Sequence, residues 1–308
     1  MAFLKNCGIM VEPQEGMAVT ELLDVAKKVE GYGFGYFFRS DHLLPTTRKT
    51  NLDSPECWVS LGAIAAHTKK VKFGPMVSPI GFRNPALLAR MACTVDSISP
   101  GRLQLGIGAG WYQDEYLAHG FEFPSVKDRK EQFHEALQII RPLTQTGRVD
   151  FEGRHFSAHL QTLPRSDRKM HMIIGARAPS IVKQTLKYAD EWNFFAAPPP
   201  EFESLKKALS AGKRHIAISQ MGPFITAENN RGLQAKIRSE MRRQSVSKDE
   251  GVFARELVSK GWLVATSADF AEEANRRREQ GIEKIYFQVW DTKDLESVEL
   301  LAGILKNI

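Results

Sequence analysis

Cysteines and long apolar runs are both scarce in this sequence. Only three of the 308 residues are cysteines (Cys7, Cys57 and Cys93), and their scattered positions fit neither a disulfide framework nor a metal-binding spacing. No stretch approaches the ~18 uncharged apolar residues that a membrane helix needs. The first residues also lack the charged start, apolar run and cleavage site of a signal peptide. We therefore expect a cytoplasmic protein with buried thiols and no membrane contact.

The excess of positive over negative charge is concentrated in a single segment. The chain carries a formal net charge of +6 at pH 7, and residues 231–248 alone supply +5 of it, with six basic side chains and one acid. Because the rest of the chain is almost neutral, a nucleic-acid-binding face spread over the fold is disfavoured, and we expect no nucleic-acid partner. The hydrophobic fraction of 43% excludes a disordered chain.

Short apolar runs alternate with amphipathic segments along the whole chain. The strand candidates are 6–11, 34–38, 71–77, 102–107, 171–174, 192–195, 214–219 and 284–289. Helical patterns separate most of them, such as 85–98, which begins with proline and repeats apolar residues at helical spacing. Eight βα units predict an α/β fold, a parallel sheet closed into a (β/α)8 TIM barrel. A doubly wound open sheet is the alternative.

Two insertions interrupt this alternation, after the fourth and the seventh strands. Residues 148–163 have the pattern of a strand pair with Gly153 at its turn, and 228–261 have the pattern of two extra helices. Ser247 and Glu250 are spaced as a capping box for the second of these helices. Without an internal repeat or a low-complexity linker, the chain is expected to form a single domain with insertions in loops at the carboxyl ends of strands, where barrel active sites lie.

Polar residues follow the second strand candidate, in the order Ser40, Asp41, His42. Side chains just past a barrel strand face the mouth, so His42 is a candidate general acid or base, with Asp41 orienting it. The alternative is a loop cap, because serine and aspartate often satisfy turn backbone. No second histidine or carboxylate cluster accompanies them, so we predict no metal site.

Glycines alternate at the end of the fourth strand candidate, at Gly106, Gly108 and Gly110, followed by Trp111. Bare backbone there would let a flat ligand lie against the strand, although close packing at a barrel corner explains the pattern equally well. Gln113 stands where a dinucleotide fingerprint needs a glycine, so that motif is excluded.

The fifth strand candidate runs into Gly175-Ala176-Arg177-Ala178, directly before a helix. Small residues at a helix N-terminus leave N–H groups free for a phosphate, and Arg177 adds a positive charge. The alternative is an ordinary tight turn between strand and helix.

Taken together, these segments resemble the bacterial-luciferase-like flavin and deazaflavin (F420) oxidoreductases. The resemblance covers nearly the whole chain and is carried by Ser40-Asp41-His42, Phe73-Gly74-Pro75-Met76-Val77, Phe82-Arg83-Asn84-Pro85, Pro100-Gly101-Arg102-Leu103, Gly106 to Trp111, Glu115-Tyr116, Tyr188 to Asn193 and Tyr286-Phe287. It implies a TIM barrel, usually homodimeric, that binds F420 or FMN at the carboxyl ends of its strands.

The resemblance also implies roles for single residues. The cofactor ring would rest against a backbone bulge at Met76–Val77, where the family commonly has a non-proline cis peptide. His42 and Asp41 would lie near the ring and the substrate as catalytic residues. The other implied cofactor contacts are Ser40, Ala109, Gly110, Trp111, Gly175, Ala176, Arg177 and Ala178. Trp111 stands where sugar-phosphate dehydrogenases of the family have a carboxylate, so that substrate class is not expected.

The resemblance favours an F420-dependent oxidoreductase that moves a hydride between F420 and a small organic substrate. One alternative is an FMN-dependent monooxygenase that uses O₂ and reduced flavin from a partner reductase. Another is a flavin-binding barrel without turnover. Since F420 carries an acidic oligoglutamate tail, the basic segment 231–248 is a candidate tail-binding surface. A solvated helix face is the alternative.

Overall fold

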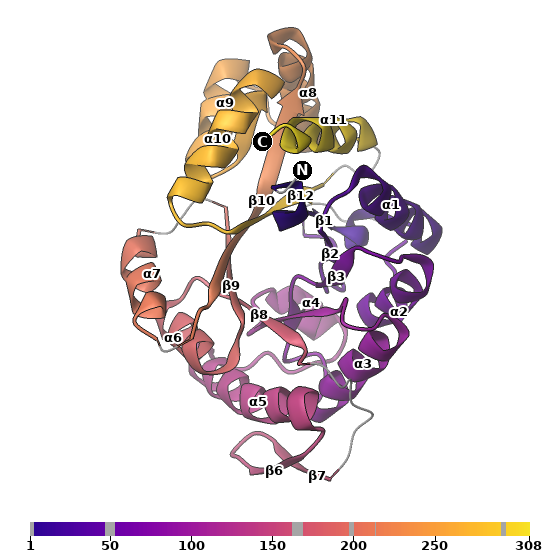
Figure 1. Ribbon diagram of the computed structural model, residues 1–308, viewed down its shortest axis with the longest axis vertical. Helices are drawn as coiled ribbons and strands as arrows, with labels where there is room; N and C mark the ends of the chain where they lie inside the picture. The colour runs from indigo at the N-terminus through magenta and orange to yellow at the C-terminus, as the bar shows by residue number, and fades with distance from the viewer. Residues whose placement is uncertain (1–2, 47–52, 162–168, 197–199, 213, 291–293) are drawn as a thin grey trace.

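A parallel β-sheet curls into an almost closed barrel in the computed structural model (Figure 1). Its strands in chain order are β1 (Cys7–Val11), β2 (Tyr36–Arg39), β3 (Lys72–Pro75), β4 (Ser78–Pro79), β5 (Gln104–Gly108), β8 (His171–Gly175), β9 (Glu191–Phe195), β10 (Ala217–Ala227) and β12 (Lys284–Val289). They pair in the order β3-β2-β1-β12-β10-β9-β8-β5-β4. A bridge between Phe73 and Leu103 links β3 to the start of β5 and completes the ring. The structure describes residues 3–46, 53–161, 169–196, 200–212, 214–290 and 294–308.

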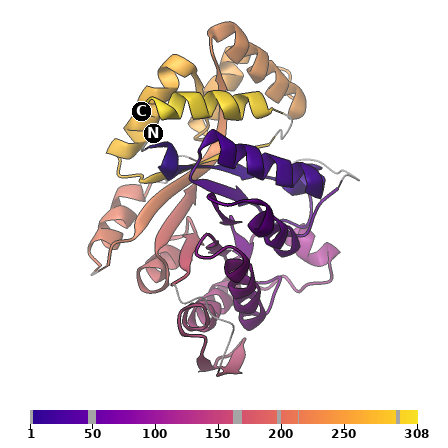
Figure 2. The same ribbon diagram turned by 45° about the vertical axis from the view of Figure 1, so that its right-hand side comes forward.

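Helices accompany this barrel, most of them around its outside (Figures 1 and 2). They are α1 (Val19–Tyr32), α2 (Cys57–His67), α3 (Pro85–Ile98), α4 (Gln113–Ala118), α5 (Val126–Thr146), α6 (Pro179–Tyr188), α7 (Phe202–Ser210), α8 (Asn230–Arg243), α9 (Glu250–Ser259), α10 (Ser267–Glu279) and α11 (Leu295–Lys306). The last of them, α11, packs between α1 and α10 and so brings the two ends of the chain to one side of the barrel (Figure 2). Among the described residues, no helix combines the length and the apolar character needed to cross a membrane.

Local capping fixes where the helices begin. The Asn84 side chain accepts a hydrogen bond from the Ala86 N–H at 2.9 Å, and Pro85 occupies the first turn of α3. The predicted capping box of α9 is wrong, because Asp249 caps this helix by accepting from the Val252 N–H at 2.9 Å. Asp249 lies one residue before the helix, whereas the Ser247–Glu250 spacing would have started it two residues too early.

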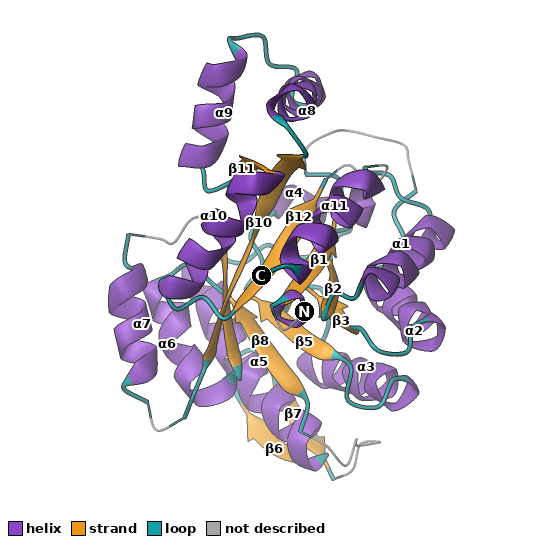
Figure 3. Cartoon of the chain, turned by 45° about the horizontal axis from the view of Figure 1, so that its top comes forward, coloured by secondary structure: helices purple, strands orange, loops and turns teal. Residues whose placement is uncertain are grey.

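Both predicted insertions are present. The first is the antiparallel hairpin β6 (Val149–Glu152) and β7 (Ser157–Leu160), and Thr162 and Leu163 of its predicted range lie outside the described residues. This hairpin follows α5 and lies along the outside of that helix, so it belongs to a return connection and not, as expected, to the barrel mouth (Figure 1). The second insertion, α8 and α9, follows the carboxyl end of β10, which is extended by pairing with β11 (Leu263–Thr266) (Figure 3).

A buried charge cluster lies at the opposite, amino end of the barrel, where β8, β9 and β12 begin. The Glu191 side chain is fully buried and accepts a hydrogen bond from the Tyr286 hydroxyl at 2.7 Å. It also pairs with His171 at 3.0 Å and with Lys284. Burial alone would raise the pKa of this carboxyl, but His171 and Lys284 lower it to about 2. The Glu191 carboxylate therefore stays ionised, and the cations beside it balance its charge.

Candidate active site

The structure places all the predicted site residues on one arc of the barrel mouth. Ser40 to His42 follow β2, Met76–Val77 follow β3, Ala109 to Trp111 follow β5, and Gly175 to Ala178 run from the end of β8 to α6. Because β2, β3, β4, β5 and β8 occupy successive places around the barrel, four segments far apart in the sequence meet along one rim. Parallel strands all end at the same edge, which is why the sequence pattern could predict this grouping.

His42 is held at the mouth by a buried glutamate. Its Nδ1 lies 3.1 Å from each carboxylate oxygen of Glu115, which also accepts the Leu43 N–H at 2.9 Å. The Glu115 side chain is only 1% exposed, whereas that of His42 is 18% exposed. Although burial lowers the pKa of His42, the Glu115 carboxylate, helped by Glu12 and Asp41, raises it above its usual value. The imidazole is therefore oriented, partly open to the mouth, and biased towards its protonated form.

Aromatic rings flank this histidine. The Trp111 and Tyr112 rings meet His42 edge-on, with centroids 5.7 and 6.1 Å away. They stack on each other at 5.2 Å, and Trp111 is 66% exposed. An exposed indole beside a held imidazole gives this part of the mouth an apolar surface.

Asp41 is directed away from the mouth into a buried ion pair. Its Oδ2 accepts from Arg83 Nη1 at 2.7 Å and from the Ser78 hydroxyl at 2.6 Å, and Oδ1 accepts from Arg83 Nη2 at 3.1 Å. Burial raises the pKa of the Asp41 carboxyl, and Arg83 opposes that shift. Arg83 also pairs with Glu56 at the start of α2. These contacts let Asp41 link the end of β2 to β4 and to the segment before α3. Neither carboxylate oxygen of Asp41 is hydrogen-bonded to His42.

Ser40 belongs to a buried chain of polar side chains. Its hydroxyl donates to Gln14 Oε1 at 2.6 Å, and Gln14 Nε2 donates to Glu12 Oε2 at 2.7 Å. Gln288 at the end of β12 donates to the other oxygen of Glu12. The network joins the carboxyl ends of β1, β2 and β12 and brings a negative charge under His42. Sequence analysis gave no site role to Glu12, Gln14, Arg83 or Glu115, although Arg83 and Glu115 belong to the segments that carry the resemblance. Glu12 and Gln14 directly follow the end of β1, and that was their available signal.

Val77 explains most of the predicted glycine pattern. The Met76–Val77 peptide bond is cis, as the resemblance implies. A Cβ added at Gly108 would lie 2.5 Å from Val77 Cγ2, and one at Gly175 would lie 2.9 Å from Val77 Cγ1. At Gly106, an added Cβ would lie 2.1 Å from the Pro75 carbonyl oxygen. Close packing of the bulge against β5 and β8, one of the two interpretations of these glycines, therefore accounts for them, and Val77 covers the backbone expected to be bare.

A Gly106→Ala variant tests this packing. We expect a loss of about 1–3 kcal/mol in the free energy of unfolding, because the new methyl meets backbone that cannot rotate away. Gly303→Ala is the matched control: nothing lies within 4 Å of its added Cβ, and alanine in an exposed helix position stabilises by roughly 0.5–1 kcal/mol. Urea unfolding measures both. Equal midpoints for Gly106→Ala and the wild type would contradict the packing argument.

The segment before α6 offers a modest set of anion donors. Gly175, Ala176 and Ala178 are partly exposed, and Arg177 is exposed. The Ala176 N–H donates to the Asn193 carbonyl at 3.1 Å, and Pro179 has no N–H. The N–H groups of Arg177, Ala178 and Ser180 then remain as candidate donors at the helix N-terminus, where first-turn N–H groups lack intrahelical partners.

The basic segment 231–248 is largely neutralised by acids. Lys236 pairs with Asp294, Arg238 with Glu250, Arg243 with Glu240 and Lys248 with Glu256. Within the described part of the chain, no ion pair involves Arg231 or Arg242. The cationic excess read from the sequence is thus mostly used in holding α8 and α9 in place, which weakens its interpretation as a surface for an acidic tail.

The family model for luciferase-like monooxygenases matches residues 2–291. The chain belongs to the luciferase-like monooxygenase family. Solved structures agree: monooxygenase RslO1 from Streptomyces bottropensis superposes with a TM-score of 0.81 at 21% identity, covering 98% of this chain and 99% of that one. An F420-dependent secondary alcohol dehydrogenase, solved with an F420-acetone adduct, gives 0.77 at 21% identity over 97% of each chain. At these identities the likeness shows the fold, and it confirms the predicted TIM barrel.

Curated relatives of this luciferase-like chain include proteins of two kinds. The F420-dependent glucose-6-phosphate dehydrogenase of Microbacterium testaceum is 32% identical over 202 residues, 64% of this chain and 60% of that protein. The pyrimidine monooxygenase RutA of Stutzerimonas stutzeri is 30% identical over 227 residues, 69% of this chain and 62% of that protein. Both matches span less than two thirds of the relative's length. The names of these relatives are those of oxidoreductases and monooxygenases, and both kinds fall within the activities of the luciferase-like family to which this chain belongs.

Proposed function

We propose that this luciferase-like enzyme transfers a hydride between deazaflavin F420 and a small organic substrate at the carboxyl end of the barrel. The observation that carries the proposal is the Glu115-held His42, which stands on the same rim as the Met76–Val77 bulge. The F420-dependent dehydrogenases among the relatives support F420, and the monooxygenases support FMN as the alternative. F420 or a flavin is thus the cofactor class, and F420 is our choice within it.

The residues present suit such a cofactor. Met76 and Val77 would back its ring, with Ala109 and Gly110 beside it, and Gly175 to Ala178 would hold its phosphate with Arg177 supplying the charge. When bound, F420 supplies the hydride acceptor or donor that no amino-acid side chain can provide. Gly110 is required by the fold itself, because its φ of +79° favours glycine and an added Cβ would lie 2.1 Å from the Tyr116 hydroxyl oxygen.

His42 is the residue we propose to hold and move a proton. Glu115 engages Nδ1, so exchange with a substrate would use Nε2, the other ring nitrogen. Trp111 would wall the substrate side and limit water there. Because Trp111 replaces the carboxylate of the sugar-phosphate dehydrogenases, we do not expect a sugar phosphate as the substrate, despite the name of the Microbacterium relative. Asp41 would act through position alone, by bracing β2 against α3.

The alternative function is an FMN-dependent monooxygenase that consumes O₂ and takes reduced flavin from a partner reductase. RutA and RslO1 favour it. A flavin-binding barrel without turnover is the third candidate.

We further propose a homodimer and a cytoplasmic location. Val59 on α2 and Leu87 on α3, 75% and 51% exposed, offer apolar surface for a second copy.

A binding titration of F420 against FMN tests the cofactor proposal. We expect saturable F420 binding and at least tenfold weaker FMN binding. Quenching of the cofactor's fluorescence measures both. Arg177→Gln should weaken F420 binding by about tenfold, the worth of one charge-assisted phosphate contact. Lys183→Gln, an exposed cation farther along α6, is the control and should bind as the wild type does. Tight FMN binding without F420 binding would overturn the proposal.

A further inference from the structure

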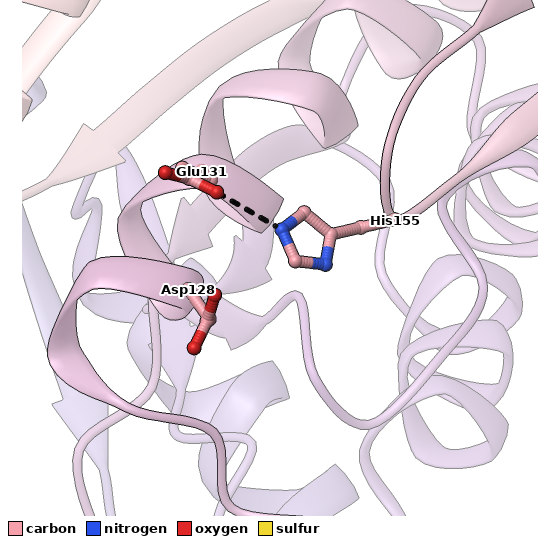
Figure 4. Close-up of side chains that lie close together, drawn as sticks. All are labelled: Asp128, Glu131 and His155. Atoms are coloured by element: carbon pink, nitrogen blue, oxygen red, sulfur yellow. Dashed lines mark hydrogen bonds and ion pairs between the residues drawn. The ribbon is translucent and has the colours of Figure 1, made fainter.

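A histidine and two carboxylates converge where the β6–β7 hairpin meets α5 (Figure 4). Asp128 and Glu131 lie one turn apart on α5, and His155 comes from the turn of the hairpin. One ligand atom from each lies within 4.8 Å of the others, and His155 Nε2 is 3.3 Å from Glu131 Oε2. All three side chains are partly exposed, so an ion could reach them.

Other contacts fix these side chains in place. The Glu135 carboxylate accepts the N–H groups of Arg154, His155 and Phe156 at 2.9–3.0 Å, which docks the hairpin turn on α5. The Ser125 hydroxyl donates to Asp128 Oδ2 at 2.6 Å and orients that carboxylate. The ligand positions are therefore set by the fold, and Asp128 already has the outer hydrogen bond that supports metal ligands.

We propose that Asp128, Glu131 and His155 bind one Zn²⁺ ion, with water as the fourth ligand. One imidazole and two carboxylates form a donor set that zinc accepts, at bond lengths of about 2.0–2.2 Å. Tetrahedral geometry at those lengths puts ligand atoms roughly 3.4 Å apart, so small side-chain rotations suffice. Sequence analysis predicted no metal site, because these ligands come from separate elements and form no spacing motif.

Arg154 competes most closely with a metal ion for both carboxylates, and Lys127 also lies 3.9 Å from Glu131. Arg154 Nη1 donates to Glu131 at 2.7 Å and its Nη2 lies 3.7 Å from Asp128. The side chain is 64% exposed and can leave towards solvent. A bound zinc ion would coordinate both carboxylates and displace this guanidinium. It would also link the hairpin to α5, because His155 and the two carboxylates come from these two elements.

The test is a zinc titration of the full-length chain without a histidine tag, after chelator treatment, with Co²⁺ absorption as a second probe. We expect one saturable equivalent and a rise in Tm of about 4 °C at saturating metal. His155→Gln and Asp128→Asn should each weaken binding by at least about tenfold. Arg154→Gln should tighten it several-fold, because the competing cation is gone.

His159→Gln provides the matched control. His159 lies on the same hairpin, between Asp150 and Glu152, and is 53% exposed, so general surface binding would depend on it as much as on His155. We expect His159→Gln to bind zinc as the wild type does. Loss of binding in His159→Gln but not in His155→Gln, or no saturable binding in the wild type, would overturn the proposal.

Discussion

A His42→Gln variant is expected to lose kcat/KM by about 10²–10⁴-fold, the range that a positioned general acid or base contributes. Glutamine keeps a polar side chain beside Glu115 but cannot exchange a proton at the ring nitrogen. The Kd for F420 should change little, because the proposed ring and phosphate contacts lie elsewhere on the rim. Steady-state kinetics with F420 and a responsive small substrate measures the first quantity, and fluorescence titration measures the second.

Glu115→Gln separates orientation from proton transfer. Removing the carboxylate lowers the pKa of His42, because Glu115 raises it in the wild type. The limb of the pH–rate profile that reports His42 should therefore move to lower pH. His119→Gln is the control: this exposed histidine, at the end of α4, bonds only the Glu115 backbone carbonyl. Unchanged kinetics in His42→Gln, or an unshifted profile in Glu115→Gln, would remove His42 from the mechanism.

Replacing Asp41 with asparagine is expected to cost about 3 kcal/mol in the free energy of unfolding. The change leaves Arg83, whose side chain is 11% exposed, without its bidentate partner, and breaking a buried pair typically costs about 3–5 kcal/mol. Glu56 still contacts Arg83, which places the loss at the lower end. Denaturant unfolding measures it. Glu256→Gln, which breaks the exposed pair with Lys248, should cost less than about 1 kcal/mol.

The same variant decides between two roles for Asp41. If Asp41 only braces the rim, the single variant Arg83→Gln and the double variant Asp41→Asn/Arg83→Gln should lose a similar amount of stability. Both variants remove the same interaction, the ion pair between Asp41 and Arg83. A small effect on stability combined with a large fall in kcat would instead favour the catalytic role predicted from the sequence, in which Asp41 supports His42.

Much of the barrel was readable from the sequence, because strands buried on both faces form continuous apolar runs. The last strand was predicted at its observed bounds, Lys284–Val289. The seventh strand was predicted over 214–219, yet β10 continues to Ala227 through pairing with β11. Helices α10 and α11 were not predicted, although α11 begins with a local cap in which the Asp294 side chain accepts a hydrogen bond from the Ser297 N–H.

The residues at the mouth of the barrel could be predicted from the sequence, but their side-chain partners could not. Residues that follow strands were assigned to the mouth because parallel strands share one edge. Glu115 lies 73 residues from His42 and Arg83 lies 42 from Asp41, and no local spacing encodes such pairs. The glycines show the same limit: their pattern was visible, but only the position of Val77 distinguishes packing against a side chain from space for a ligand.

The most direct test of the proposed function is one anaerobic and one aerobic assay that follow F420 absorbance and O₂ uptake together. The substrate panel should include a secondary alcohol, glucose-6-phosphate and small unsaturated carbonyl compounds. Our account predicts a substrate-dependent change in F420 redox state, equal with and without O₂, that is lost in His42→Gln. O₂ consumption with reduced FMN, together with no change in F420 for any substrate, would contradict it.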